Sequence, residues 1–397
     1  MTRKLAPSSR LDTMKESQIR EMTRLALSCG AINLSQGFPD FDPPEEVLDA
    51  AARALKEGVN QYTITWGTPG LRAAIARTMR ARYSPHFEWV DPDQHVTVTC
   101  GVTEGIVAAL MGTIESGDEV IIIEPAHENY VPATRFAGGK PVFVPLAPPA
   151  YALDAERIEA AITPRTKAIL FNTPNNPTGR VFTRAELEAV AAICIQHELL
   201  AITDEIYERI LYDNREHIPL ATLPDMAERT VTISGLGKTF AMTGWRLGYA
   251  VALEPWSTAL RTIHDFTTIC APAPLQAAAV AALNLPESFY ERQTEEYHER
   301  RALIMEALAA TGFEVSSPEG SYYVLADYSR WDANMDCREF ARWLTTDVGV
   351  AVVDGASFYE TEGFGEGTVR FAFAKKISTL REARDRLLEG FSKSTKS

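Results

Sequence analysis

Short apolar runs alternate with amphipathic stretches through the middle of the chain. The apolar runs have the length of buried strands and lie at His95–Thr99, Glu119–Ile123, Pro141–Val144, Ala168–Phe171, Leu200–Thr203 and Thr230–Ile233. Helical patterns separate most of them, as at Glu104–Ile114, Arg184–His197 and Pro255–His264. Because short apolar strands between helices are typical of a parallel sheet covered on both faces, the pattern predicts a mostly parallel α/β fold.

The two ends of the chain follow different patterns. Before the alternating region, helices are predicted over Gln18–Ser28, Glu45–Leu55 and Leu71–Arg82, with a Pro- and Gly-rich loop at Leu34–Pro44. After it, a long charged helix is predicted over Phe289–Thr311, with Tyr297, Arg301, Ile304 and Leu308 at helical spacing. Strand patterns near Tyr322–Leu325 and Val369–Ala374 then predict a smaller α+β region.

Composition and charge exclude several classes of protein. The net charge of -14 over 397 residues argues against nucleic-acid binding and against adsorption on anionic membranes. The five cysteines are scattered, without a C-x-x-C pair or a Cys/His cluster of zinc spacing, so neither disulfides nor a metal are expected. No signal peptide or membrane-spanning run is seen, which predicts a cytoplasmic protein.

A lysine in a glycine-rich turn carries the first sign of chemistry. Lys238 follows the apolar run that ends at Ile233, and Arg246 comes eight residues later. A desolvated amine becomes a nucleophile toward carbonyls, and a guanidinium suits a phosphate, which together match what pyridoxal phosphate requires. A nucleotide-binding P-loop ending at Thr239 is the competing interpretation, but it requires a glycine where this chain has Thr232.

Polar residues follow several predicted strands, where ligands bind in open α/β sheets. Gly101, Val102 and Thr103 open a helix and could bind an anion, although Thr103 could equally be an N-cap. Asn176, in a turn rich in proline, could donate to a ring oxygen or form an Asx-turn.

A carboxylate at the end of a buried strand indicates a cationic partner. Asp204 ends such a strand, and a protonated pyridine nitrogen would compensate its charge. Tyr207, three residues on, could reach the same ring oxygen as Asn176. Glu205 is expected to face solvent or a neighbouring basic residue.

These motifs resemble those of fold-type-I, class I aminotransferases. Asn176-Pro-Thr-Gly179, Asp204-x-x-Tyr207 and Lys238 with Arg246 occur in the order and approximate spacing of that family. Gln36-Gly37-Phe-Pro-Asp-Phe41 and Asn60-Gln-Tyr62-Thr resemble the branch with kynurenine, methionine and glutamine aminotransferases. The resemblance implies a seven-stranded, mostly parallel sheet in a large domain (46–286), a small α+β domain (287–397), and an N-terminal segment (1–45) joining the small domain.

The resemblance also implies a role for each matching residue. Lys238 matches the lysine that binds pyridoxal phosphate covalently, Asp204 the partner of its ring nitrogen, and Asn176 and Tyr207 the donors to its ring oxygen. Gly101, Val102, Thr103 and Arg246 match the phosphate site. Tyr62 matches a tyrosine that reaches the cofactor of the other subunit, which implies a homodimer with a shared active site. Arg370, with Gly37 nearby, matches the binding site for the substrate α-carboxylate; Gly37 could also be a simple turn glycine.

Three positions depart from the family pattern. His127 stands where relatives stack an aromatic ring on the cofactor, so either pH-sensitive stacking or a loop histidine with satisfied hydrogen bonds is possible. Gly235 replaces a serine that binds phosphate, which makes Ser234 a doubtful substitute. Ile19 replaces an N-terminal aromatic residue of kynurenine-type enzymes, which weakens kynurenine as the preferred substrate.

The expected reaction is transamination between an L-amino acid and a 2-oxo acid by a ping-pong mechanism. Neutral or aromatic donors such as methionine, glutamine, phenylalanine or kynurenine are expected, because no second basic residue is placed for a distal carboxylate. Phe38, Tyr130, Tyr322 and Tyr323 are candidates for the side-chain pocket or for ordinary core. A cysteine-conjugate β-lyase or another enzyme on the same cofactor would share every motif.

Overall fold

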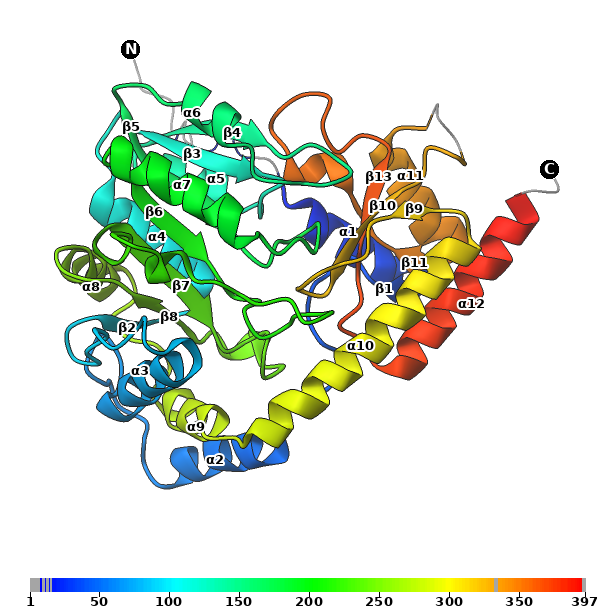
Figure 1. Cartoon of the computed structure of the whole chain (residues 1–397). Helices are drawn as coiled ribbons and strands as arrows, with labels where there is room; N and C mark the ends of the chain where they lie inside the picture. Colours follow the sequence, from blue (N-terminus) through cyan, green and yellow to red (C-terminus); the bar gives the residue numbers. More distant parts are fainter. Residues whose placement is uncertain (1–7, 9–10, 12–13, 15, 332–334, 395–397) are drawn as a thin grey trace, which may run out of the picture.

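A seven-stranded sheet forms the centre of the larger part of the molecule (Figure 1). The computed structural model describes residues 8, 11, 14, 16–331 and 335–394. The strands run in the order β2-β8-β7-β6-β5-β3-β4, and β8 is antiparallel to both of its neighbours, while the other pairs are parallel. Their bounds are β2 Val96–Thr99, β3 Glu119–Glu124, β4 Lys140–Pro145, β5 Thr166–Asn172, β6 Leu200–Asp204, β7 Thr230–Gly235 and β8 Gly248–Val251. The expected mostly parallel, seven-stranded sheet is therefore confirmed.

Strand β8 is the one member of this sheet whose position the sequence patterns did not predict. It is four residues long and begins at Gly248, in a segment that looks like the continuation of a turn. A Cβ atom on Gly248 would lie 2.6 Å from the carbonyl carbon of Gly101. The glycine therefore permits a close approach between a strand and the loop before α4, rather than forming a turn.

Helices cover both faces of this sheet, as the strand–helix alternation predicts. Ile121 and Ile123 of β3 pack in the same buried cluster as Leu187 of α7, whereas Val120 and Ile122 pack with Leu110 of α4. This alternation places α4, α5 and α8 on one face and α6 and α7 on the other. The helices of the larger part are α2 Glu45–Lys56, α3 Pro69–Tyr83, α4 Val102–Thr113, α5 Tyr130–Phe136, α6 Ala155–Ala160, α7 Arg184–Gln196, α8 Trp256–Thr267 and α9 Ala273–Leu283.

Local sequence signals explain where several of these helices begin. Thr183 and Glu186 form a reciprocal capping box at the start of α7. Helix α9 begins at Ala273 with a proline in its first turn, where the missing N–H has no helical partner to lose. The prolines of the alanine-rich stretch therefore start a helix.

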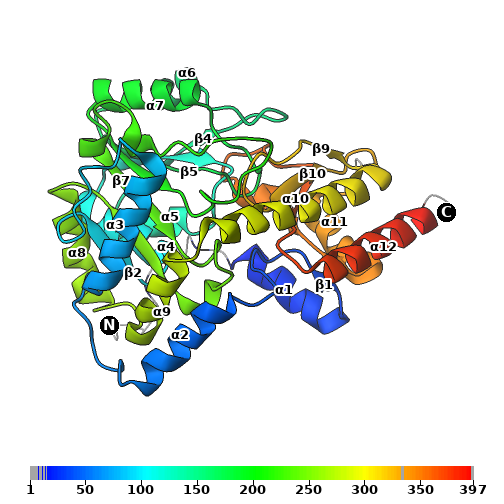
Figure 2. The ribbon, with the colours of Figure 1, turned by 60° about the horizontal axis from the view of Figure 1, so that its bottom comes forward.

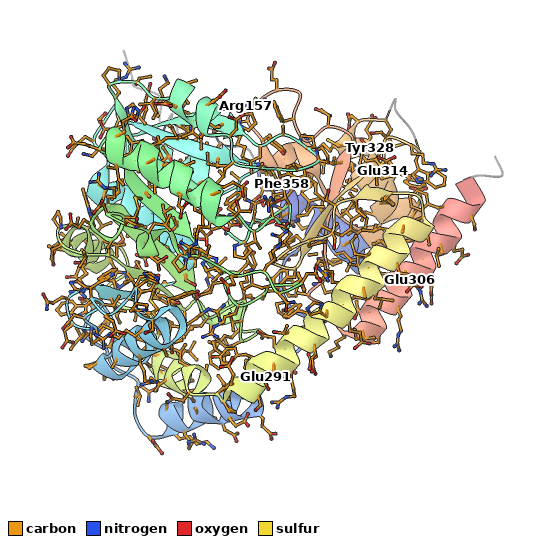
Figure 3. All side chains as sticks on the ribbon, in the orientation of Figure 1. Arg157, Glu291, Glu306, Glu314, Tyr328 and Phe358 are labelled. Atoms are coloured by element: carbon orange, nitrogen blue, oxygen red, sulfur yellow. The ribbon has the colours of Figure 1, made fainter. Side chains whose placement is uncertain are left out.

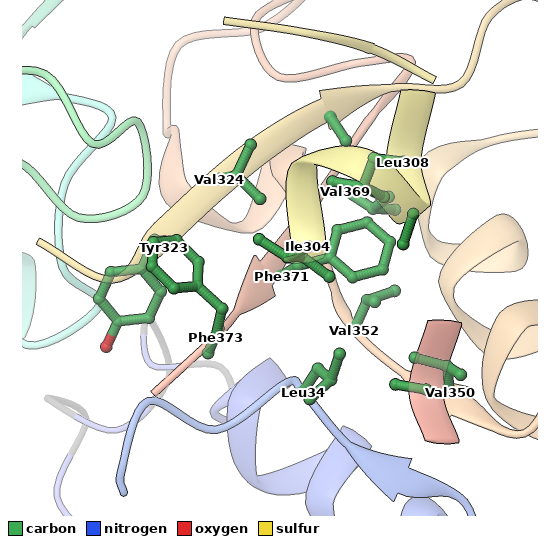
Figure 4. Close-up of a cluster of buried hydrophobic side chains, with 14 of the residues drawn as sticks. Leu34, Ile304, Leu308, Tyr323, Val324, Val350, Val352, Val369, Phe371 and Phe373 are labelled. Atoms are coloured by element: carbon green, nitrogen blue, oxygen red, sulfur yellow. The ribbon is translucent and has the colours of Figure 1, made fainter. Parts of the chain in front are cut away.

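The smaller part combines both ends of the chain. Its elements are α1 Gln18–Cys29, β1 Ile32–Asn33, α10 Glu287–Ala310, β9 Glu314–Val315, β10 Tyr323–Asp327, α11 Cys337–Trp343, β11 Val350–Ala351, β12 Val353–Asp354, β13 Thr368–Ala372 and α12 Ile377–Ser394. Strand β1 pairs in parallel with β11, and Leu34 packs with Val350 and Phe371 in the core shown in Figure 4. The domain boundaries at residues 45 and 286 stay predictions, but this pairing attaches the N-terminal segment to the C-terminal region.

Helix α10 runs from the region of α2 and α9 to the smaller part, where it lies beside α12 (Figures 1 and 2). Tyr297, Ile304 and Leu308 are buried along it, as predicted, while Glu291 and Glu306 are exposed on its outer side (Figure 3). The fourth predicted position, Arg301, is not core: its guanidinium pairs with Asp213 at 2.6 Å.

Among the described residues, no helix combines the length and the apolar character needed to cross a bilayer. The cytoplasmic location stays a prediction.

Candidate active site

A cavity of about 260 Å³ opens where the ends of β5, β6 and β7 face the N-terminal segment and the strands β10 and β13. It is the place where the two parts of the molecule in Figure 1 meet. The predicted site residues that line it are Gly37, Gly101, Val102, Thr103, His127, Asn176, Asp204, Tyr207, Lys238, Arg246 and Arg370. Tyr62 is the predicted residue that lies outside it, with its side chain 78% exposed.

Lys238 projects its amine toward the N-terminal segment across the cavity. Its Nζ donates a hydrogen bond to the carbonyl oxygen of Gly37 at 2.8 Å and lies 5.7 Å from the ring centroid of Tyr207. Loss of solvent is the largest influence on this amine and lowers its pKa below the ordinary value, and the positive charge of Arg370 acts in the same direction. The amine is therefore closer to its neutral, nucleophilic form than a surface lysine.

The structure does not support the nucleotide-loop interpretation of this segment. Thr232, at the position that a P-loop glycine would occupy, is buried within β7 and paired in register with both neighbouring strands. A loop that has to begin inside a central strand cannot curl around a phosphate.

Asp204 ends β6 and is buried beneath the cavity. The hydroxyl of Tyr130 donates to its Oδ2 at 2.7 Å, and the backbone N–H of Ile206 donates to its Oδ1 at 3.2 Å. Burial raises the pKa of this carboxyl to about 6, against the opposing effect of these hydrogen bonds and of the Lys238 charge. A buried carboxyl group with a raised pKa gains from a cationic partner. A protonated ring nitrogen beside Asp204 would stabilise the ionised carboxylate.

Arg370, on β13, is almost completely buried without an acidic partner among the described residues. Its Nη1 donates to Oδ1 of Asn176 at 3.0 Å, and its Nη2 donates to the carbonyl oxygen of Ser35. Its Nε has no hydrogen-bond partner among the described residues. The rings of Tyr323 and Phe358 lie 4.5 and 4.8 Å from the guanidinium carbon. An open N–H on a buried guanidinium suits a carboxylate ligand.

Asn172 explains how Asn176 becomes available to Arg370. Oδ1 of Asn172 accepts the backbone N–H of Asn176 at 2.8 Å, and Oδ1 of Asn175 accepts that of Thr178 at 3.2 Å. The neighbouring asparagines therefore make the local turn contacts, and Oδ1 of Asn176 accepts from Arg370 instead. Nδ2 of Asn172 also donates to the carbonyl oxygen of Asp204 at 2.7 Å, which ties the ends of β5 and β6 together.

The start of α4 and Arg246 form the cationic end of the cavity. Gly101, with φ +80°, is the N-cap residue of α4, which leaves Thr103 inside the first turn and rules out its N-cap role. A Cβ atom on Gly101 would lie 2.5 Å from Nη2 of Arg246, so only glycine lets the guanidinium approach the loop so closely. Backbone N–H groups at a helix start and an arginine are well suited to a phosphate.

Ser234 does not contribute to this anion site. Its buried hydroxyl lies 3.3 Å from the carbonyl oxygen of Glu205 and 3.2 Å from Oε1 of Glu208, to either of which it can donate, and it does not line the cavity. The position of Ser234 outside the cavity agrees with the interpretation that it does not replace the phosphate-binding serine of the family. Glu205 is also buried, and its carboxylate lies 2.7 Å from Nε2 of His217. Of the two surroundings expected for Glu205, solvent or a basic residue, the structure shows the basic residue.

His127 lines the cavity, and its surroundings disfavour the protonated imidazole. Burial, followed by the positive charges of Lys238 and Arg370, lowers the pKa of its imidazole to about 3. The expectation of pH-sensitive stacking is therefore wrong, because the ring stays neutral at physiological pH.

A group of tyrosines packs around Lys238. The hydroxyls of Tyr207 and Tyr323 are 3.1 Å apart, and Tyr322 donates to the carbonyl oxygen of Gly37 at 2.9 Å. A Cβ atom on Gly37 would lie 1.7 Å from the Tyr323 hydroxyl, so close approach and not a turn requires glycine here. Of the four predicted pocket aromatics, Tyr130 and Tyr323 line the cavity, whereas Phe38 and Tyr322 do not.

Sequence reasoning missed several residues that line or support the site. They are Arg20, Glu128, Asn129 and Asn172, together with the hydrogen-bonding role of Tyr130. Asn172 and Tyr130 follow predicted strands and could have been found by the strand-end criterion, but Arg20 lies on a distant helix and carries no such signal.

The cavity thus combines an amine of lowered pKa, a buried carboxylate, a helix start and a buried arginine, which together would suit a ligand with carbonyl, phosphate and carboxylate groups. The chain belongs to the aminotransferase class I and II family, whose model matches residues 30–387. It is a pyridoxal phosphate-dependent aminotransferase of fold type I, and the family implies that cofactor.

Relatives with several different names share this fold along nearly their full length. The chain is 38% identical to a probable N-succinyldiaminopimelate aminotransferase of Mycobacterium tuberculosis, over 96% of this chain and 97% of that protein. It is 36% identical to a methionine aminotransferase of Escherichia coli, over 96% and 98% of the two chains. The solved structure of the N-succinyldiaminopimelate aminotransferase from M. tuberculosis superposes with a TM-score of 0.93 at 39% identity, covering 97% of this chain and 100% of that chain.

Proposed function

We propose that this aminotransferase moves the amino group of a neutral or aromatic L-amino acid, such as methionine, glutamine, phenylalanine or kynurenine, to a 2-oxo acid by a ping-pong mechanism. The observation that carries the proposal is the convergence of Lys238, Asp204 and Arg370, a buried arginine whose Nε has no partner among the described residues, on one cavity. Ile19 and Tyr323 line the same cavity and supply an apolar surface for an uncharged side chain.

The residues present fit pyridoxal phosphate. Gly101, Val102, Thr103 and Arg246 would hold its phosphate, Asp204 the protonated ring nitrogen, and Asn176 and Tyr207 the ring oxygen, with His127 against the ring. When bound, the cofactor supplies an electron sink that makes the Cα proton of an attached amino acid acidic. Asp204 keeps the ring nitrogen protonated, which maintains that sink.

Lys238 has two tasks in this proposal. Its amine would hold the cofactor covalently and, once displaced by the amine of the substrate, would accept the proton from Cα and pass it to the former aldehyde carbon of the cofactor. Burial lowers its pKa, which increases the share of the neutral amine that can accept a proton. Arg370 fixes the α-carboxylate, with Gly37 beside it, so that the Cα–H bond faces the Lys238 amine.

We also propose a homodimer in which Tyr62 completes the cavity of the partner subunit. Phe266 is 88% exposed and Tyr62 78% exposed, and Ile64 and Ile269 are exposed as well. The contact of 3.0 Å between Nε2 of His264 and the carbonyl oxygen of Thr65 joins the two segments that carry them. An exposed apolar patch at this place favours a subunit interface.

Transfer of a labelled amino group tests the proposed reaction. The holoenzyme, given methionine with nitrogen-15 in its amino group and a 2-oxo acid, should place the label in the amino acid formed from that 2-oxo acid. With a cysteine conjugate as substrate, amino transfer should exceed the release of pyruvate and ammonia. A cysteine conjugate labelled in the same way, if its label appeared only as ammonia together with pyruvate, would instead support the β-lyase alternative.

A further inference from the structure

One cation of the cavity has no task in the proposed reaction. Arg20, on α1, lines the cavity and is exposed, so its guanidinium lies at the opening. Its backbone N–H bonds to Oγ of Ser17, but its guanidinium forms no hydrogen bond or ion pair with the described residues. The positive charge nevertheless acts inward, because it contributes to the low pKa of His127.

Helix α1 is held firmly at the rim of the cavity. The hydroxyl of Ser17 donates to Oε1 of Glu128 at 2.7 Å, and the hydroxyl of Thr23 donates to Oε1 of Gln36 at 3.1 Å. On the side of the smaller part, Glu21 pairs with Arg342 at 2.9 Å. The backbone that carries Arg20 is therefore fixed, whereas its long side chain is free to meet a ligand.

The acidic residue of the same rim does not neutralise Arg20. Glu128 is half-buried, accepts the Ser17 hydroxyl and forms no ion pair with Arg20. An unpaired guanidinium at the opening of a cavity attracts an anionic group, and its planar pair of donors suits a carboxylate.

The position of Arg20 relative to the other cations determines which anionic group it can reach. In the proposed function, Arg370 binds the α-carboxylate at the buried end of the cavity and Lys238 acts at Cα. The substituent on Cα then extends toward the opening, along Ile19 and Tyr323. A carboxylate at the end of that substituent would meet Arg20.

We propose that Arg20 recognises the second carboxylate of a dicarboxylic 2-oxo acid, and of the amino acid formed from it. This inference rests on the proposed function, in which one cavity accepts two substrates in turn. The side chain of a neutral amino donor would contact the apolar wall formed by Ile19 and Tyr323. The second carboxylate of an acidic acceptor would also contact the guanidinium of Arg20. This proposal differs from the expectation drawn from the sequence, which found no second basic residue placed for a distal carboxylate.

Arg20→Met tests this assignment, because methionine keeps a long flexible side chain and removes the charge. For 2-oxoglutarate as acceptor, kcat/KM should fall about tenfold, mainly through KM, since a charged hydrogen-bonded contact is lost. For 2-oxohexanoate, which has no second carboxylate, kcat/KM should change less than about twofold. Arg20→Lys should recover part of the activity with 2-oxoglutarate.

Arg24→Met is the matched control, because Arg24 is an exposed arginine of the same helix whose partner is Glu16 and which does not line the cavity. It should leave both acceptors unaffected. A direct binding readout is calorimetric titration of the holoenzyme with glutarate, whose affinity should fall in Arg20→Met and not in Arg24→Met. Equal losses for the two acceptors, or no loss for 2-oxoglutarate, would overturn the role of Arg20. Absence of amino transfer by the wild type with every acceptor would instead overturn the proposed function.

Discussion

At the scale of single residues, burial rather than ion pairing sets the chemistry of the site. Lys238 and Arg370 both have pKa values lowered chiefly by burial, and Asp204 has one raised for the same reason. The sequence predicted Lys238 from a glycine-rich turn and Asp204 from a strand end, whereas Arg370 was identified through the family resemblance. The sequence could not predict the low pKa of His127, since that depends first on burial in the folded cavity and then on charges from three distant segments.

Asp204 should make the stability of the cofactor-free protein depend on pH. Its pKa is about 6 in the folded protein and 3.8 ordinarily, so the folded state favours the protonated form. This contribution to stability is fully present below the ordinary value and is lost as pH rises through 6; it amounts to up to about 3 kcal/mol. The variant Asp204→Asn has no carboxyl group at this position, so its stability should lack this pH-dependent contribution.

Urea unfolding of the cofactor-free wild type and Asp204→Asn between pH 4 and pH 7 measures this effect. The free energy of unfolding of the wild type should fall relative to that of the variant across the range. Parallel curves for the two proteins would show that Asp204 is not desolvated as described.

At the scale of elements, the cavity depends on where strands end and where helices begin. The alternating pattern predicted β5, β6 and β7 and thereby placed Asn176, Asp204 and Lys238 along one edge of the sheet. It did not predict β8, because four residues after a glycine-rich turn carry no periodicity. The close packing of β8 against the loop of Gly101, which orients the start of α4, was therefore not predictable.

At the scale of the whole molecule, long-range contacts complete the site. Ile32 of β1 pairs with Val350 of β11, although the two residues lie near opposite ends of the chain. This pairing places α1 at the cavity. Hydrophobic periodicity predicts α1 as a helix but not which cavity it lines, so Ile19 was identified by family resemblance and Arg20 was missed.

The proposed dimer gives a prediction at this scale. Phe266→Glu places a charge in the exposed patch beside Tyr62, so it should shift the protein from dimer to monomer and strongly reduce aminotransferase activity. Analytical ultracentrifugation and the assay measure both effects. Leu27→Glu is the control, because Leu27 is 79% exposed on α1, away from the patch, and its change should alter neither. An active Phe266→Glu monomer would contradict the shared active site.

The most direct test of the central claim is to locate the covalent bond between pyridoxal phosphate and the protein. Among the residues that the structure describes, two lysines have amines with lowered pKa values: Lys238, and Lys375, whose pKa burial lowers to about 8. Nζ of Lys375 donates to the carbonyl oxygen of Phe38 at 2.8 Å, and this lysine does not line the cavity. Borohydride reduction of the holoenzyme, digestion and peptide mass spectrometry should find the adduct on Lys238 and none in Lys238→Ala. An adduct on Lys375, or on no lysine, would contradict the account.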